Sequence, residues 1–174
     1  MVSGQDDLSQ SSVYWSPAID DTGVRPSHFI GTDTKLSFIS VSHIRIYKDS
    51  PESEFAKIAY EVKRDSQNSA LPDTQVLIKT ESSNVFAMDD LRDPFSHSYE
   101  LLRGIKKFSY TYYKRDGNTW KKSKSWDSEK EEPKNSYPDI IELTLEVIGP
   151  QRQSFEGVFK FRPEIPLNGL YPST

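Results

Sequence analysis

A basic segment from Arg103 to Lys124 holds the residues of this chain that are best suited to bind a ligand. Its eight Lys and Arg residues stand against one Asp, so its net charge is 8 − 1 = +7. Aromatic residues are interleaved with these cations at Phe108, Tyr110, Tyr112, Tyr113 and Trp120. A β-hairpin with stacking rings and flanking cations would form a platform for single-stranded nucleic acid.

The same pattern also suits the core of an ordinary sheet. Phe108, Tyr110 and Tyr112 share one alternating face, so they can pack inward while the lysines face solvent. The residues just downstream would then neutralise the cations, and they are Asp127, Glu129, Glu131 and Glu132. Single-stranded nucleic-acid binding through residues 103–124 is therefore the alternative function, and overall we expect no nucleic-acid partner.

The remaining candidate catalytic groups form no recognisable motif. His28, His43 and His97 are far apart and include no helical pair of the HExxH type. The serines and glycines form no G-x-S-x-G elbow, P-loop or dinucleotide-binding loop, and the absence of cysteine excludes thiolate chemistry. We predict no catalytic residue, no cofactor-binding residue and no metal site.

Neighbouring carboxylates occur at four places in the sequence. They are Asp6–Asp7, Asp20–Asp21, Asp89–Asp90 with Asp93, and Glu131–Glu132. None has the alternating oxygens and turn glycine of a calcium loop, so we expect solvated charges. A hydrolase is a third hypothesis, because two carboxyl groups about 5–9.5 Å apart can cleave a glycosidic bond. Its candidate residues are Asp89, Asp90, Asp93 and Glu142.

The length and composition exclude several classes of protein. A chain of 174 residues predicts one domain. The mean hydropathy is −0.68 and 34% of residues are hydrophobic, but 12% are aromatic, and large rings bury ~150–250 Å² each. The net charge of −4 argues against a protein built as a whole to coat nucleic acid. No apolar run approaches the ~18–20 residues needed to cross a bilayer.

Alternating hydrophobic residues predict an antiparallel sheet system that positions these side chains. Strands are expected around 58–62, 108–112, 140–148 and 155–161. Turns are expected at Asp116–Asn118 and at Gly149–Gln153. Residues 5–14 favour a short helix or the end of a longer one, Tyr99–Arg103 a single helical turn, and Ser123–Tyr137 a mobile surface loop.

The stretch from Leu101 to Leu145 resembles the type II secretion minor pseudopilin J family. The shared pattern is a Leu-Leu-x-Gly run, an aromatic strand, a glycine turn, two tryptophans and a proline that opens an alternating strand. It is carried here by Leu101, Leu102, Gly104, Phe108, Tyr110, Tyr112, Gly117, Trp120, Trp126 and Pro138. Upstream, Asp7-Leu8, Phe29-Ile30-Gly31 and the strand at 58–62 follow the family order, so the resemblance covers roughly Asp7 to Phe161.

The resemblance implies a fold and a non-catalytic function. The implied fold is α+β, with an N-terminal helix packed on two antiparallel β-sheets that resemble an incomplete barrel. The family's minor pseudopilins J, I and K assemble at the pseudopilus tip and support export of folded proteins across the outer membrane. The implied partners are pseudopilins I and K, then the major pseudopilin and secreted exoproteins. The implied location is the periplasm, with an N-terminal helix anchored in the inner membrane.

The start of the chain departs from the family pattern. A prepilin peptidase site and a long hydrophobic helix are expected but do not occur in this sequence. Residues 1–4 are therefore expected to be an engineered start, residues 5–15 the end of the pseudopilin helix, and residues 16–174 a β-rich periplasmic globular domain. Leu8, Val13 and Tyr14 are the candidate contact with pseudopilins I and K; alternatively they pack on this chain's own sheet.

Overall fold

The computed structural model describes residues 28–40, 55–66, 71, 73–83, 96–128, 130, 136–149 and 151–163. They form nine strands: β1 (Phe29–Gly31), β2 (Lys35–Ser40), β3 (Ala56–Arg64), β4 (Gln75–Ser82), β5 (Ser96–Asp116), β6 (Thr119–Ser123), β7 (Trp126–Asp127), β8 (Ile140–Ile148) and β9 (Ser154–Phe161). These residues contain no helix long and apolar enough to cross a membrane.

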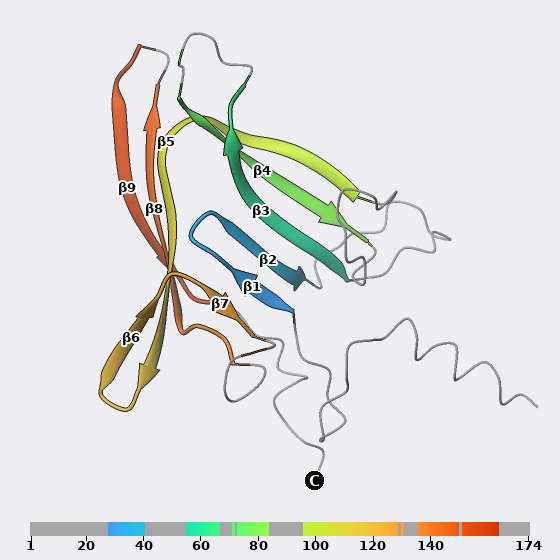
Figure 1. The fold of residues 1–174 in the computed structure, drawn as a ribbon, viewed down its shortest axis with the longest axis vertical. Coiled ribbons are helices and arrows are strands. Elements are labelled where there is room, and N and C mark those ends of the chain that lie inside the picture. The colour runs from blue at the N-terminus through green and yellow to red at the C-terminus, as the bar shows by residue number, and fades with distance from the viewer. Residues whose placement is uncertain are drawn as a thin grey trace, which may run out of the picture.

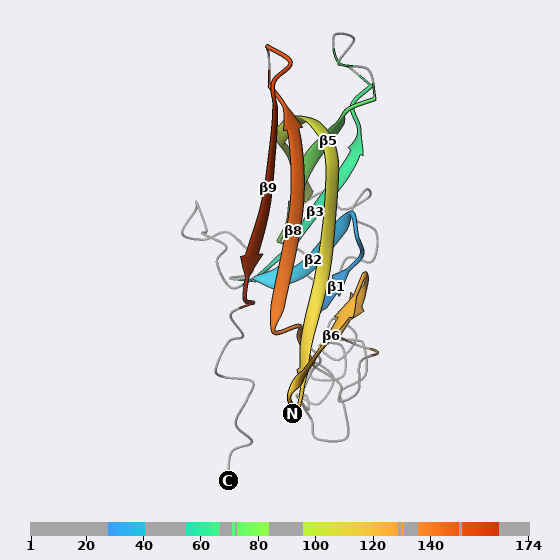
Figure 2. The same ribbon diagram turned by 90° about the vertical axis from the view of Figure 1, so that its left-hand side faces the viewer.

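The strands make one antiparallel sheet with the order β7-β1-β2-β3-β4-β5-β8-β9, and β6 pairs with the last residues of β5. Figure 1 shows how the sheet curls, because the upright β8–β9 hairpin stands at an angle to the inclined strands β1–β4. Figure 2 shows β5, β8 and β9 running side by side after a quarter turn. The sheet is thus a half-barrel with β9 at one end of the strand order.

The curl is located at Gly104, within the long strand β5. The preceding part of β5 pairs with β4, and the part from Ile105 onward pairs with β8. Both ladders shift register near this point, as β-bulges do where a strand bends. Gly104 has a φ of +74°, and a Cβ on it would lie 2.7 Å from the carbonyl oxygen of Ile148. A residue with a side chain would therefore be strained there and would also collide with β8.

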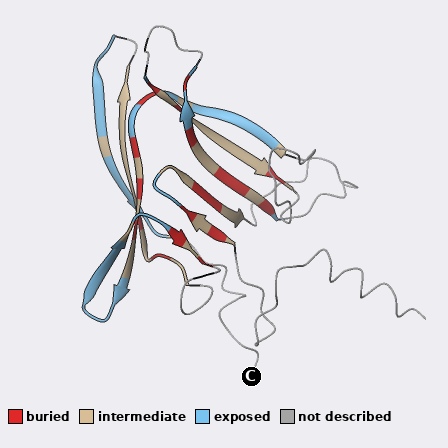
Figure 3. Cartoon of the chain, in the orientation of Figure 1, coloured by how far each residue is buried: buried red, intermediate tan, exposed pale blue. Residues whose placement is uncertain are grey.

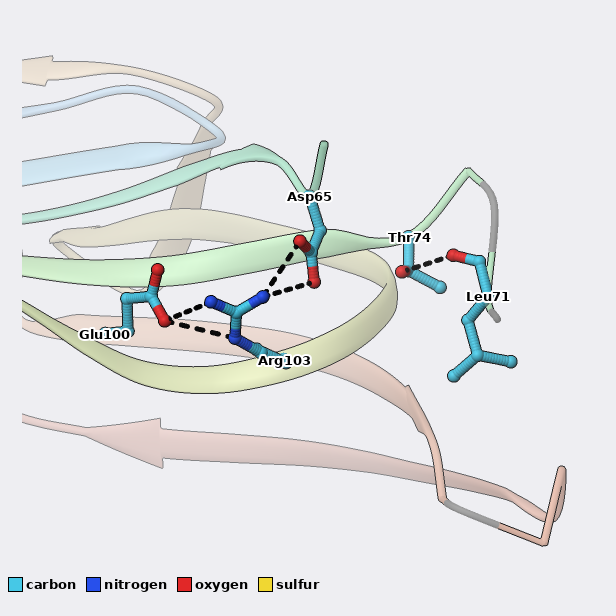
Figure 4. Close-up of polar contacts among 5 residues, drawn as sticks. All are labelled: Asp65, Leu71, Thr74, Glu100 and Arg103. Carbon is cyan, nitrogen blue, oxygen red and sulfur yellow. Dashed lines mark hydrogen bonds and ion pairs between the residues drawn. The ribbon is translucent and has the colours of Figure 1, made fainter. Parts of the chain in front are cut away.

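An ion-pair cluster beside the bend ties it to the β3–β4 connection (Figure 4). Arg103 Nη1 donates to both carboxylate oxygens of Asp65, at 3.1 and 3.3 Å, and the guanidinium also pairs with Glu100. The Asp65 side chain is 2% exposed, so its charge requires partners of this kind. Thr74 Oγ1 donates to the Leu71 carbonyl on the same connection.

The core lies between β5 and the short strands β1 and β2. Tyr112 is fully buried, and its hydroxyl donates to the Thr32 carbonyl oxygen at 2.8 Å. The Tyr110 amide donates to the Asp33 carbonyl, also at 2.8 Å. A Cβ on Gly31 would overlap the Tyr112 ring and hydroxyl, so glycine is what allows β1 to approach β5.

The predicted fold class is wrong for the described residues. They are all-β and form one curled sheet, whereas the prediction was an α+β fold with a helix packed on two antiparallel sheets. The helix expected at 5–15, and the start expected at 1–4, lie outside the described residues. The single sheet follows from β5, which is long enough to pair with β4 along its first part and with β8 along its second.

Two local predictions are also corrected, and two are confirmed. Tyr99–Arg103 is strand, because pairing with β4 overrides the local preference for a turn. The predicted loop at Ser123–Tyr137 includes β7, where Trp126 pairs with Gly31 and is buried. Both hairpins are confirmed: β5–β6 turns at Gly117, with a φ of +59°, and β8–β9 turns between Gly149 and Gln153.

Replacing Gly104 by alanine is expected to lower the free energy of unfolding by about 2–4 kcal/mol, from the positive φ and the collision with Ile148. Gly117→Ala is the matched control, because Gly117 has a similar φ but a Cβ added there would meet no atom within 4 Å. It should cost about 1 kcal/mol. Urea unfolding of both variants measures the two losses of unfolding free energy. Equal losses would contradict the predicted collision between a side chain at position 104 and the Ile148 carbonyl.

Alkaline pH is expected to destabilise the fold through the buried tyrosines. Burial raises the pKa of Tyr110 to about 12, and burial also raises the pKa of Tyr112. An unfolded tyrosine has a pKa of ~10. Tyr110 therefore contributes fully to the free energy of unfolding below pH ~10. This contribution, about 2–3 kcal/mol, is lost as the pH rises towards 12. Urea unfolding at a series of alkaline pH values measures the decline, which should be smaller in Tyr110→Phe; an identical decline would contradict this assignment.

Candidate assembly surface

Most of the motif residues that the sequence singled out build the fold. Phe108, Tyr110 and Tyr112 point into the core, with exposures of 7%, 5% and 0%. Gly104 forms the bend of β5, and Gly117 forms the β5–β6 turn. Each of these residues therefore has a structural reason for its type.

The second half of the motif closes the core. The Trp126 ring is buried, and its Nε1 donates to the Ser136 carbonyl at 2.9 Å. Pro138 is buried just before β8 begins, and Leu102 packs partly against the core. Leu101 and Trp120 are the exposed exceptions, at 50% and 49%. The motif thus describes one contiguous structural unit, from β5 through β6 and β7 to β8.

The basic segment does not form the predicted stacking platform. Three of its five rings are the buried Phe108, Tyr110 and Tyr112, and a buried ring cannot stack on a base. Acidic side chains lie within 4 Å of five of its eight cations: Arg103, Lys106, Lys107, Lys114 and Lys121. Lys122 lies over the Tyr113 ring, 5.8 Å from its centroid. The buried rings match the ordinary sheet that the sequence also allowed. The acidic partners of the five cations are Asp65, Glu146, Glu156, Asp139 and Asp116, whereas the predicted partners Glu129, Glu131 and Glu132 lie outside the described residues.

Of the candidate hydrolase residues, the structure describes only Glu142. Glu142 accepts a hydrogen bond from the Tyr113 hydroxyl and lies 3.2 Å from Lys160 Nζ, so it is a member of a cross-strand ion pair. Asp89, Asp90 and Asp93 lie outside the described residues.

The histidines assemble no site among the described residues. His28 lies 3.3 Å from the Ser37 hydroxyl and His97 pairs in register with Glu81, whereas His43 lies outside the described residues. Among the described residues no three His, Cys, Asp or Glu side chains could hold one metal ion. The candidate contact residues Leu8, Val13 and Tyr14 are also outside them.

An apolar face crosses β5, β8 and β9 and becomes steadily more exposed towards the edge of the sheet. Its residues occupy every second position of β8 and β9, and in register they are Ile105–Val147–Phe155, Phe108–Leu145–Gly157, Tyr110–Leu143–Phe159 and Tyr112–Ile141–Phe161. The β5 members are buried, and those of β8 are mostly half-buried. Phe155, Phe159 and Phe161 are 61%, 54% and 41% exposed. Figure 3 shows this change of burial across the three strands.

The strand that carries these exposed rings is also a sheet edge. In the part of the chain that the structure describes, β9 pairs with β8 on one side and with no strand on the other. An edge strand presents unpaired N–H and C=O groups, which form a template for pairing with another chain. Exposed rings beside a free edge are typical of an interaction surface. The sequence predicted the strand and its evenly spaced rings but not their exposure, which depends on the strand order.

The fold resembles that of a solved structure, whereas the sequence searches found no match. No protein-family model and no curated protein sequence matches the chain. The fold is similar to a chain in the crystal structure of the GspK-GspI-GspJ complex from the enterotoxigenic Escherichia coli Type 2 Secretion System. The identity is 15%, the TM-score is 0.45, and the match covers 91% of this chain and 97% of that chain.

Single-stranded oligonucleotides are expected to leave the tryptophan fluorescence of the protein unchanged, even at low salt, because three rings of the basic segment are buried and most of its cations are paired. The measurement is a fluorescence titration at low and at physiological salt. Quenching that weakens steeply as salt rises, and that disappears in Trp120→Ala, would instead establish the nucleic-acid function.

Proposed function

We propose that this chain is a J-type minor pseudopilin, a structural subunit at the pseudopilus tip of a type II secretion system that supports export of folded proteins across the outer membrane. Its partners are pseudopilins I and K, with the major pseudopilin and secreted exoproteins as further contacts. It acts in the periplasm, and in the full-length protein a hydrophobic N-terminal helix anchors it in the inner membrane. The function involves no catalysis.

The observation that carries the proposal is the coherence of the motif from Leu101 to Leu145. Its glycines bend β5 and turn the β5–β6 hairpin, its aromatic strand fills the core, and its second tryptophan pairs beside Gly31. Gly31 belongs to the upstream part of the same resemblance and gives Tyr112 the space it needs. The shared residues therefore work together in the fold, which unrelated similarities scattered along a chain would not do.

The free apolar edge supports an assembly role independently of the motif. Protein interfaces combine an apolar centre with a polar rim. Phe155, Phe159 and Phe161 supply apolar surface at β9, and Glu156 and Lys160 alternate with them on the other face of that strand. A subunit that works by contacting other chains needs surface of this kind.

The contact with pseudopilins I and K is proposed to include Leu8, Val13 and Tyr14. The double substitution Leu8→Asp/Val13→Asp is expected to weaken binding to the soluble domains of I and K from the same organism at least tenfold, because it places charge in an apolar contact. Ser9→Asp/Ser12→Asp is the matched control, since it adds the same charge to the same segment at polar positions, and it should bind normally.

Size-exclusion chromatography and pull-down of the purified domains measure this association. The proposal predicts a complex that contains this chain with I and K. The absence of binding to either domain, also with chains extended at the N-terminus, would contradict the proposed function. Equal weakening by the two double substitutions would contradict the assigned contact.

A further inference from the structure

We propose that two copies of this chain associate through their β9 edges, pairing antiparallel about a two-fold axis at Val158 so that the two sheets become continuous. The inference concerns self-association and does not depend on the proposed function. It rests on three features of β9: which backbone groups face outward, how its side chains are arranged about Val158, and how exposed its rings are.

The β8–β9 turn determines which β9 residues present free backbone groups. The Gly149 amide donates to the Gln153 carbonyl at 2.8 Å, so this pair is hydrogen-bonded across the hairpin. Hydrogen-bonded and non-bonded pairs alternate along an antiparallel ladder, and the β8–β9 register is regular from Ile148 to Ile141. The odd-numbered residues of β9 therefore bond to β8. The N–H and C=O groups of Glu156, Val158 and Lys160 point away from β8, to the side where the described residues place no strand.

The side chains of β9 are complementary to themselves in one register. With Val158 on the two-fold axis, Glu156 lies opposite Lys160 of the second copy, and Lys160 lies opposite its Glu156. On the other face Phe155 lies opposite Phe161, and Gly157 lies opposite Phe159. Opposite charges and aromatic pairs that face each other across strands are favourable. All outward backbone groups between residues 156 and 160 then bond, because even-numbered residues meet even-numbered residues.

Neighbouring registers keep only part of this complementarity. With the axis at Gly157, Glu156 meets Val158 and Lys160 meets Ser154. With the axis at Phe159, Glu156 meets Arg162 but Lys160 meets Val158. Only the register centred on Val158 pairs both charged residues of β9 with opposite charges. Within one chain Glu156 lies 3.7 Å from Lys107 and Lys160 lies 3.2 Å from Glu142, and the second copy adds a further opposite charge to each pair. Charge complementarity thus selects a second copy of this chain as the occupant of the edge.

Gly157 is covered by a ring of its own strand. A Cβ on Gly157 would lie 2.8 Å from the Phe159 ring of the same strand, so that ring occupies the space above the glycine in each copy. Aromatic residues commonly cover glycines in this way at sheet edges.

The exposed area predicts a weak dimer. Six Phe rings of ~200 Å² each, about half exposed, offer roughly 600 Å² of apolar surface. Specific stable interfaces bury about 1,200–2,000 Å² in total. Dimerisation is therefore expected at roughly 10–100 µM protein. The measurement should include protein concentrations well above this range.

Exchanging the two charges tests the register. Glu156→Lys alone and Lys160→Glu alone each place like charges opposite one another at both ends of the junction, and each should weaken dimerisation about tenfold. An equimolar mixture of the two variants should associate as well as the original chain, because every charge then meets its opposite. The double variant should associate normally for the same reason. Sedimentation equilibrium measures these constants, and circular dichroism verifies that each variant is folded.

Cysteine cross-linking provides a second test that does not depend on charge. The chain has no cysteine. In the proposed register Val158→Cys sets two thiols across the axis at a Cα separation of about 5.5 Å, which a disulfide spans. Glu156→Cys is the matched control, because its two copies are four residues out of register, about 13 Å apart. Oxidation at high protein concentration should cross-link Val158→Cys and leave Glu156→Cys monomeric.

A monomer at every concentration, or equal cross-linking of the two cysteine variants, would overturn the β9 junction. So would a mixture of Glu156→Lys and Lys160→Glu that associates no better than either variant alone. These outcomes are distinguishable from failure of the proposed function, because they use this chain alone, whereas the proposed function is tested by binding to pseudopilins I and K.

Discussion

The strand β5 has 21 residues and pairs with both parts of the sheet, and its backbone can follow that path because Gly104 adopts a positive φ beside the Ile148 carbonyl. Before the bend β5 runs along β4, and after it β5 runs along β8. The ion pair between Arg103 and Asp65 holds the bend against the end of β3. The half-barrel, and the position of β9 at its edge, both follow from this change of direction.

A second constraint fixes how far the half-barrel closes. The Tyr112 hydroxyl reaches the Thr32 carbonyl, and Gly31 leaves space for its ring. This contact brings β1 and β2 over the middle of β5, where they cover Phe108 and Tyr110. They do not extend over the rings of β9, which are accordingly exposed. The same closure that buries the centre of the apolar face therefore leaves its margin available to another chain.

Much of the local structure could be predicted from the sequence, and the arrangement of the sheet could not. Alternating residues with turn signals indicated the β5–β6 and β8–β9 hairpins, because partners close in sequence are fixed by local geometry. Tyr99–Arg103 and Trp126 were misassigned, because their strand structure comes from pairing with β4 and β1, far away in the sequence. The fold class failed for the same reason: whether strands form one sheet or two depends on a single bend.

The exposure of the candidate surface could not be predicted from the sequence either. The sequence revealed Phe155, Phe159 and Phe161 as strand residues, but their exposure depends on β9 being last in the strand order. The proposed junction places this edge against a second copy of the chain. Residue-resolved amide exchange of β9, measured in dilute protein and in concentrated protein that has dimerised, tests this junction most directly. We predict that the amides of Glu156, Val158 and Lys160 exchange fast when dilute and are protected on assembly; exchange that is equally fast in both states would contradict the junction.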